Sequence, residues 1–133
     1  MSLAQNGFMF DAVQRFYDVV ARDKEGDLAD DALFNAGICF LNMRLYHDAV
    51  ATFTKVIQGY PDATICALGG ARESGRTAAK AHYGRLKAHL ALGDRSGAQK
   101  DLETLKGFKD SHVVDAKGRK RTFHDLGVEA IKS

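Results

Sequence analysis

Two amphipathic segments, separated by a short break and closed by the single proline of the chain, constrain the fold most strongly. The first segment has the i, i+3, i+4, i+7 spacing of one helix face, with Leu33, Ala36, Gly37 and Phe40. The second segment repeats a helical face with Ala49, Val50, Phe53, Val56, Ile57 and Tyr60. Proline lacks a backbone N–H, so Pro61 marks the end of the second helix. The pattern predicts a helix hairpin over residues 30–61.

Small residues in the middle of both predicted helices indicate a close crossing. Gly37 follows Ala36 in mid-helix, where glycine costs about 1 kcal/mol relative to alanine. That cost is explained if another helix passes close by, and Ala49 offers a small residue on the second helix. Phe40 and Phe53 are then expected to fill the space around the crossing.

The residue types in this hairpin resemble the signature of the tetratricopeptide repeat, which has a period of about 34 residues and two helices per unit. The positions that carry the resemblance are Leu33, Ala36, Gly37, Phe40, Tyr46, Ala49, Phe53, Val56 and Pro61. The resemblance implies an all-α fold in which antiparallel helix hairpins stack as a short right-handed superhelix. Residues 30–61 are also similar to small bacterial proteins of the Tol–Pal-associated and outer-membrane-assembly type.

The segments on either side repeat this pattern less completely. Ala12, Phe16 and Val19 have the mutual spacing of the apolar residues in the second helix, which predicts a half repeat over residues 8–24. A polar loop is expected to follow it at residues 24–27.

A degenerate repeat is predicted over residues 79–106. Its second helix carries Ala98, Leu102 and Leu105 at the same spacing. Asp94 stands in the turn before this helix and is expected to be its N-cap, because an aspartate side chain accepts hydrogen bonds from the first backbone N–H groups.

The first helix of that repeat departs from the family pattern. Leu86 stands where a small residue is expected, and His82, Arg85 and His89 occupy positions that are usually apolar. His82 and His89 lie two helical turns apart, about 10 Å, which is too far for them to share a metal ion without other ligands. We therefore interpret both histidines as ordinary interface residues and predict no metal site.

The remaining residues form an insertion and a tail. The insertion, residues 62–78, contains three glycines and is interpreted as a loop, a short helix over residues 65–68 or a disordered segment.

The tail, residues 107–133, is expected to end in a helix that caps the last repeat, since Thr122 and Asp125 have the spacing of a capping box. Within the tail, residues 113–118 are alternatively predicted to form a small hairpin. The whole chain, residues 1–133, is predicted to be one domain.

Composition excludes several classes of partner. Charged residues make up 27% of the 133 residues, both signs are interspersed, and the net charge is +2, so no global field indicates nucleic acid or a membrane surface. No apolar run reaches the roughly 18 residues of a membrane-spanning helix, so no membrane insertion is expected. Residues 1–5 lack the features of a signal peptide. The compartment stays unknown, with the cytoplasm favoured over a bacterial periplasm.

The motifs of common active sites are missing from the sequence. The glycine-rich stretch at residues 69–76 lacks the lysine and the preceding strand of a phosphate-binding loop. Cys39 and Cys66 have no metal-ligand spacing and are interpreted as reduced, partly buried thiols. The basic residues between Lys117 and Arg121 are interpreted as a solvated turn. We therefore expect no enzymatic activity and no cofactor.

One predicted helix is more apolar than a core requires. Phe34, Ile38, Leu41 and Leu45 form a second stripe on the first helix of the strong hairpin, so that this helix is apolar nearly all round. Such a helix is either packed on both sides or keeps one face for a partner. Packing against the half repeat or the insertion therefore remains open, and so does self-association as a homodimeric scaffold.

The resemblance implies that the first helices of successive units line a concave groove. When the groove positions of the family are carried over to this sequence one by one, the groove residues are Phe34, Asn35, Ile38, Leu41, Asn42, Lys80, Tyr83 and Lys87. The two asparagine amides are suited to an extended peptide backbone, and the two lysines to a carboxylate. Phe34 replaces a lysine that is typical of the carboxylate-binding members, so we expect an apolar or mixed groove. The predicted function is a non-enzymatic module that binds a protein or peptide.

Overall fold

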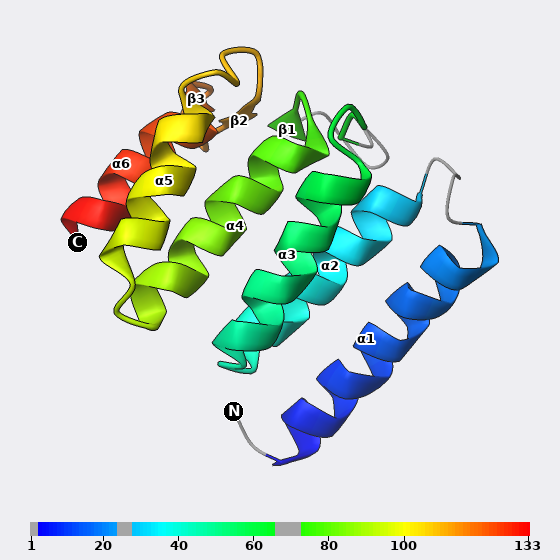
Figure 1. Cartoon of the computed structure of the whole chain (residues 1–133). Helices are drawn as coiled ribbons and strands as arrows, with labels where there is room; N and C mark the ends of the chain where they lie inside the picture. The colour runs from blue at the N-terminus through cyan, green and yellow to red at the C-terminus, as the bar shows by residue number, and fades with distance from the viewer. Residues whose placement is uncertain (1–2, 24–27, 66–72) are drawn as a thin grey trace.

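The structure is a computed structural model that describes residues 3–23, 28–65 and 73–133. The described chain contains six helices that pack one after another as antiparallel hairpins, with a small sheet at one end (Figure 1). The helices are α1 (Leu3–Arg22), α2 (Ala29–Asn42), α3 (Tyr46–Gly59), α4 (Thr77–Ala91), α5 (Arg95–Leu105) and α6 (Phe123–Lys132). The strands are β1 (Glu73–Ser74), β2 (His112–Val114) and β3 (Lys120–Thr122). The predicted all-α fold of stacked hairpins with a C-terminal helix is confirmed.

The close crossing in the strong hairpin involves three helices. A Cβ placed on Gly37 of α2 would lie 2.6 Å from Cε1 of Phe53, and one placed on Gly84 of α4 would lie 2.6 Å from Cζ of the same ring. The ring of Phe53 on α3 is fully buried between the two glycines. This packing explains the mid-helix glycine of α2, and α4 supplies a second one.

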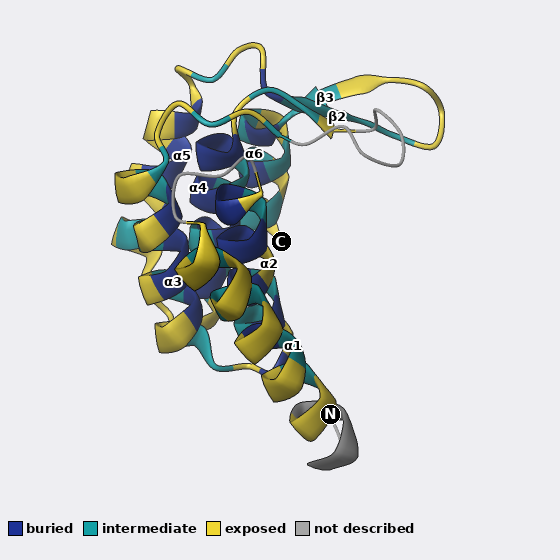
Figure 2. Ribbon diagram, turned by 90° about the vertical axis from the view of Figure 1, so that its right-hand side faces the viewer, coloured by how far each residue is buried: buried dark blue, intermediate teal, exposed yellow. Residues whose placement is uncertain are grey.

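The structure explains why the large residue Leu86 stands where the repeat pattern has a small one. Leu86 is fully buried in a second core cluster with Leu102 and Leu105 of α5. The small residue that makes room lies on α6, because a Cβ on Gly127 would approach Leu102 Cδ1 to 2.9 Å and Leu86 Cδ1 to 3.1 Å. The core thus has two clusters, one formed by α2, α3 and α4 and one formed by α4, α5 and α6, and Figure 2 marks the buried residues on the ribbon.

The β2–β3 segment is an antiparallel hairpin, which confirms the alternative predicted for residues 113–118 and extends it. His112 pairs with Thr122, and Val114 pairs with Lys120. The turn between the strands is held by Asp115, whose Oδ1 accepts hydrogen bonds from the backbone N–H groups of Lys117 and Arg119, both at 2.9 Å.

The third strand, β1, lies in the segment that was interpreted as a loop, a short helix or disorder. Glu73 and Ser74 pair antiparallel with β2. Gly75 follows at φ +110°, and a side chain there would collide with Ser111, so glycine is required. Residues 66–72 lie outside the described residues, as does the polar loop predicted at 24–27.

Both predicted helix caps are confirmed. Asp94 Oδ1 accepts a hydrogen bond from the Gly97 N–H at 2.9 Å at the start of α5. At the start of α6, Thr122 and Asp125 form a reciprocal capping box with two hydrogen bonds of 3.1 Å. The boundaries predicted for the repeat units remain predictions, although α4 begins at Thr77, two residues before the predicted start of its repeat.

Candidate functional site

A groove of about 390 Å³ lies between α2 and α4, and residues of β1, β2 and α6 complete its lining. Its lining residues are Phe34, Asn35, Ile38, Glu73, Lys80, Tyr83, Gly84, Lys87, Val113, Phe123 and Leu126. Six of the eight residues predicted for a partner-binding groove therefore share one cavity: Phe34, Asn35, Ile38, Lys80, Tyr83 and Lys87. Leu41 and Asn42 do not line it.

Two lysines of α4 lie across aromatic rings of the groove. The Lys80 ammonium is 4.3 Å from the centroid of the Phe34 ring and forms a salt bridge of 2.9 Å with Glu73. The Lys87 ammonium is 4.7 Å from the centroid of the Tyr83 ring, and burial lowers the pKa of this lysine. The groove thus combines apolar walls with positive charge held against the rings.

The far wall of the groove comes from the C-terminal part of the chain. The rings of Tyr83 and Phe123 are 6.1 Å apart, centre to centre, and tilted by 40°. Burial, and then the negative charge of Glu129 on α6, raise the pKa of the Tyr83 hydroxyl. Nothing in the sequence signalled that Phe123 and Leu126 line the groove, because no pattern along the chain indicates that α6 packs against α4.

The apolar stripe on α2 is largely used by the core. Phe34 is only 8% exposed, and its ring lies 5.6 Å from that of Phe53. Ile38 and Leu41 pack against the same core cluster, and Leu45 packs against the cluster between α1 and α2. Internal packing, which the sequence left open, therefore accounts for most of the stripe, while Phe34 and Ile38 also reach the groove. Asn42 is exposed at the end of α2.

A buried charge cluster between α4 and α5 was not predicted. Asp101 is 1% exposed, and its Oδ1 is 2.8 Å from His82 Nδ1. Arg85 donates to both carboxylate oxygens of Asp101, with Nη2 at 2.6 Å, and reaches Thr54 on α3 at 3.0 Å. His89 Nε2 lies 3.8 Å from Asp101 Oδ2. The polar residues at usually apolar positions of α4 are thus explained by one acidic partner on α5.

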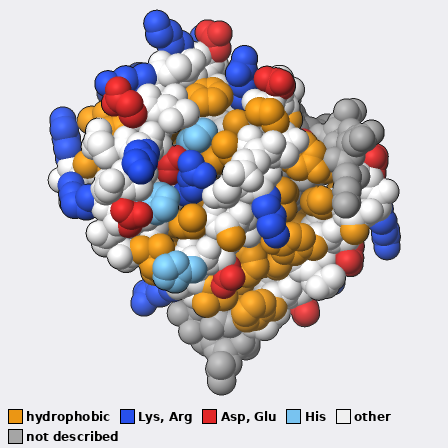
Figure 3. Space-filling model, viewed as in Figure 1, with side chains coloured by type: hydrophobic (Ala, Val, Ile, Leu, Met, Phe, Trp, Pro, Cys, Tyr) orange, Lys and Arg blue, Asp and Glu red, His pale blue; other side chains and the backbone are white. Residues whose placement is uncertain are grey.

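The electrostatic balance at Asp101 favours the carboxylate. Burial by itself raises the pKa of this group, but hydrogen bonds from His82 and Arg85 and the positive charge of Arg85 outweigh it, so that the pKa is lowered. Figure 3 shows the corresponding face of the molecule, on which histidine, basic and acidic side chains lie close together. In the part of the chain that the structure describes, no three His, Cys, Asp or Glu side chains are arranged to hold a metal ion.

The other residues that the sequence singled out lie apart from the groove. Cys39 is a free, buried cysteine, and burial raises the pKa of its thiol. Cys66 falls outside the described residues. The basic turn is exposed from Lys117 to Lys120 and half-buried at Arg121, with Arg119 paired to Asp115 at 2.9 Å and Arg121 paired to Glu129.

Comparison with known protein families identifies the central hairpin. Residues 31–63 match the tetratricopeptide repeat family. The match includes nearly all of α2 and all of α3 and so supports the predicted superfamily, and repeats of this family are typically non-enzymatic protein-interaction modules. No curated protein matches the chain. Among the described helices, none is both long and apolar enough to cross a membrane.

Proposed function

We propose that this tetratricopeptide-repeat chain binds an extended segment of another protein in the groove between α2 and α4. The observation that carries this proposal is the convergence of Asn35 on α2 with Tyr83 and Lys87 on α4 in one apolar groove. These residues come from two successive hairpins, and the first helices of such hairpins are where the family presents its binding residues.

The chemistry of the lining residues indicates the kind of segment that fits. Ile38, Val113 and Leu126 offer apolar contacts to a side chain inserted between α2 and α6. The exposed amide of Asn35 can donate to and accept from a peptide backbone. Lys80 is already paired with Glu73, so Lys87 is the better candidate to meet an acidic group. We therefore expect a ligand with an apolar residue next to an acidic one.

The charge of Lys87 supports the same expectation. Because burial lowers the pKa of Lys87, its ammonium is less well solvated than an exposed one. A ligand carboxylate placed beside it would restore favourable interactions with the charged form. Binding is then expected to weaken as the salt concentration rises, since the contact is partly electrostatic.

The test is selection of binding peptides from a random display library, followed by affinity measurements in solution. We expect Asn35→Ala and Lys87→Ala each to weaken binding by about tenfold, which is the loss of one hydrogen bond or ion pair in a groove. Lys55→Ala is the matched control, because Lys55 also lies against an aromatic ring, that of Tyr17, but outside the groove. Equal affinity of all three variants and the wild-type chain would refute the groove as the binding site.

The alternative function is a structural scaffold that acts by self-association through the α2 stripe. It is the weaker candidate, because Phe34 is nearly buried and Ile38, Leu41 and Leu45 already pack against core clusters. Little apolar area on α2 remains for a second copy. Self-association through the groove would be indicated if a groove variant, such as Lys87→Ala, changed the molecular mass in solution.

A further inference from the structure

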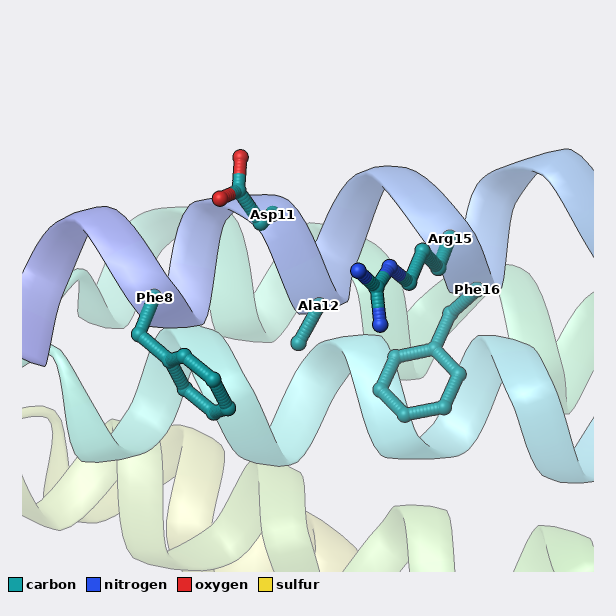
Figure 4. Close-up of a pocket in the computed structure, with 5 residues that line it drawn as sticks. All are labelled: Phe8, Asp11, Ala12, Arg15 and Phe16. Carbon is teal, nitrogen blue, oxygen red and sulfur yellow. The ribbon is translucent and has the colours of Figure 1, made fainter.

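An apolar strip on α1 is exposed although its residue pattern is that of a packed helix. Phe8 is 74% exposed and Val19 is 41% exposed, with the half-buried Ala12 and Phe16 between them. Phe8, Ala12 and Phe16, with Asp11 and Arg15, enclose a depression of about 270 Å³. Figure 4 shows the two phenylalanine rings on either side of Ala12, on the same side of the helix. We call Phe8, Ala12, Phe16 and Val19 the α1 strip.

The equivalent positions on α3 show what such a strip does when it is covered. Ala49, Phe53 and Val56 have the spacing of Ala12, Phe16 and Val19, and all three are fully buried between α2 and α4. On α1, neighbouring α2 covers Val13 fully and Ala12 and Phe16 in part, whereas Phe8 and Val19 stay exposed. The α1 strip therefore has the form of a helix-packing surface, with a small residue at its centre and a large ring on each side.

Charges along the edge of the strip indicate the partner. Asp11 and Arg15 are one helical turn apart, so both follow the same edge of α1. Neither forms a salt bridge with another residue that the structure describes. When two identical helices pack antiparallel about a two-fold axis, a residue towards one end lies beside the residue towards the other end of the second helix. Asp11 of one copy would then meet Arg15 of the other, twice in the same interface.

We propose that the α1 strip binds the α1 strip of a second copy of this chain in an antiparallel, two-fold symmetric pair. Phe8 of each copy packs against Phe16 of the other, and the two Ala12 residues meet at the close crossing. Four apolar residues per copy make a small interface, so the association is reversible and depends on concentration. The strip shares no residue with the groove between α2 and α4, so the inference does not rest on the proposed peptide binding.

The charge pair gives the sharpest test, because both residues are exposed and their replacement leaves the core of the chain unchanged. The molecular mass is measured by sedimentation equilibrium from micromolar to millimolar concentrations. Asp11→Arg and Arg15→Asp each place like charges together at both symmetric contacts, and each is expected to weaken the dimer by about tenfold. The double variant exchanges the charges and is expected to restore the wild-type affinity. Only a self-complementary interface predicts this restoration.

A second pair of variants tests the apolar contact. Phe8→Asp is expected to abolish the dimer, whereas Phe10→Asp is the matched control on the same helix, because Phe10 is 51% exposed and lies on the opposite side of α1 from the strip. A chain that is monomeric at every concentration overturns the proposal, as do equal effects of the two phenylalanine variants. Failure of the double charge exchange to restore association, or binding of a different protein by the strip of a monomeric chain, also overturns it.

Discussion

At the scale of single residues, the ring of Phe53 joins two hairpins through two glycines. Gly37 and Gly84 leave no space for a side chain, because the ring that each of them faces is fully buried and is confined by the other helix. The cost of glycine in a helix is thereby offset by the contact between α2, α3 and α4. The same ring cannot move away from one helix without colliding with the other.

The substitution Gly84→Ala is expected to destabilise the chain. The added methyl group would lie 2.6 Å from the Phe53 ring, and overpacking of this kind costs about 1–3 kcal/mol, which exceeds the gain in helix propensity of about 1 kcal/mol. Urea denaturation measures the free energy of unfolding. Gly7→Ala is the control, because no atom lies within 4 Å of the added group, and it is expected to stabilise α1. If both variants are stabilised alike, the ring is not confined.

Asp101 makes the stability of the folded chain depend on pH in the acidic range. Its pKa in the folded chain is lower than its unfolded value of about 3.9, so the unfolded chain binds more protons between the two values. The stability that Asp101 contributes is therefore fully present above the unfolded pKa and is lost as the pH falls through the folded pKa. The groups that face it are His82, Arg85 and His89.

We expect Asp101→Asn to lower the free energy of unfolding by about 3 kcal/mol at neutral pH, because Arg85 and His82 lose a buried charged partner. The difference between wild type and variant is expected to shrink as the pH falls below about 4, because the carboxylate is then protonated in the unfolded wild-type chain while the folded chain still holds it ionised. Urea denaturation at a series of pH values measures this difference in the free energy of unfolding. The exposed Asp62 provides the control Asp62→Asn, for which we expect no comparable loss. A difference that stays constant down to pH 2 would contradict the assignment.

At the scale of elements, periodicity predicted the α2–α3 hairpin, since its apolar faces and its closing proline are local signals. Strand β1 was not predictable in the same way. It has two residues, and its pairing depends on β2, which follows two further helices along the chain. The sequence also could not explain how the large side chain of Leu86 fits at its position, because the glycine that accommodates it lies on α6. Local patterns predict elements, whereas contacts between distant elements need the folded chain.

The capping box of α6 gives a prediction at this scale. Thr122→Ala removes the side-chain oxygen that accepts a hydrogen bond from the Asp125 N–H, and it is expected to cost about 1 kcal/mol of stability. Amide hydrogen exchange should accelerate first in α6, which carries Phe123 and Leu126 into the groove. Thr104→Ala is the control, because the Thr104 hydroxyl only donates to the Lys100 carbonyl within α5. Equal effects of the two threonine variants would show that the box does not stabilise α6.

At the scale of the whole molecule, the groove is a property of the assembled stack. The sequence predicted its α2 and α4 residues from the resemblance, but the walls from β2 and α6 follow from how the C-terminal helix packs back on α4. Leu41 and Asn42, which the resemblance also implies, do not line this cavity. The α1 strip lies outside this cavity, so the molecule has two separate surfaces with apolar lining residues.

If both proposals hold, a pair of chains presents two grooves and binds a peptide-coated surface with avidity. Binding of the second groove is then intramolecular, and the apparent affinity for the surface exceeds the affinity for the same peptide in solution by about 100-fold or more. Surface plasmon resonance and fluorescence anisotropy measure the two affinities. Phe8→Asp is expected to remove the difference while the solution affinity stays unchanged. Lys87→Ala, in contrast, should weaken solution binding and leave the molecular mass of the pair unchanged. A Phe8→Asp chain with undiminished surface affinity would mean that pairing through α1 does not link the two grooves.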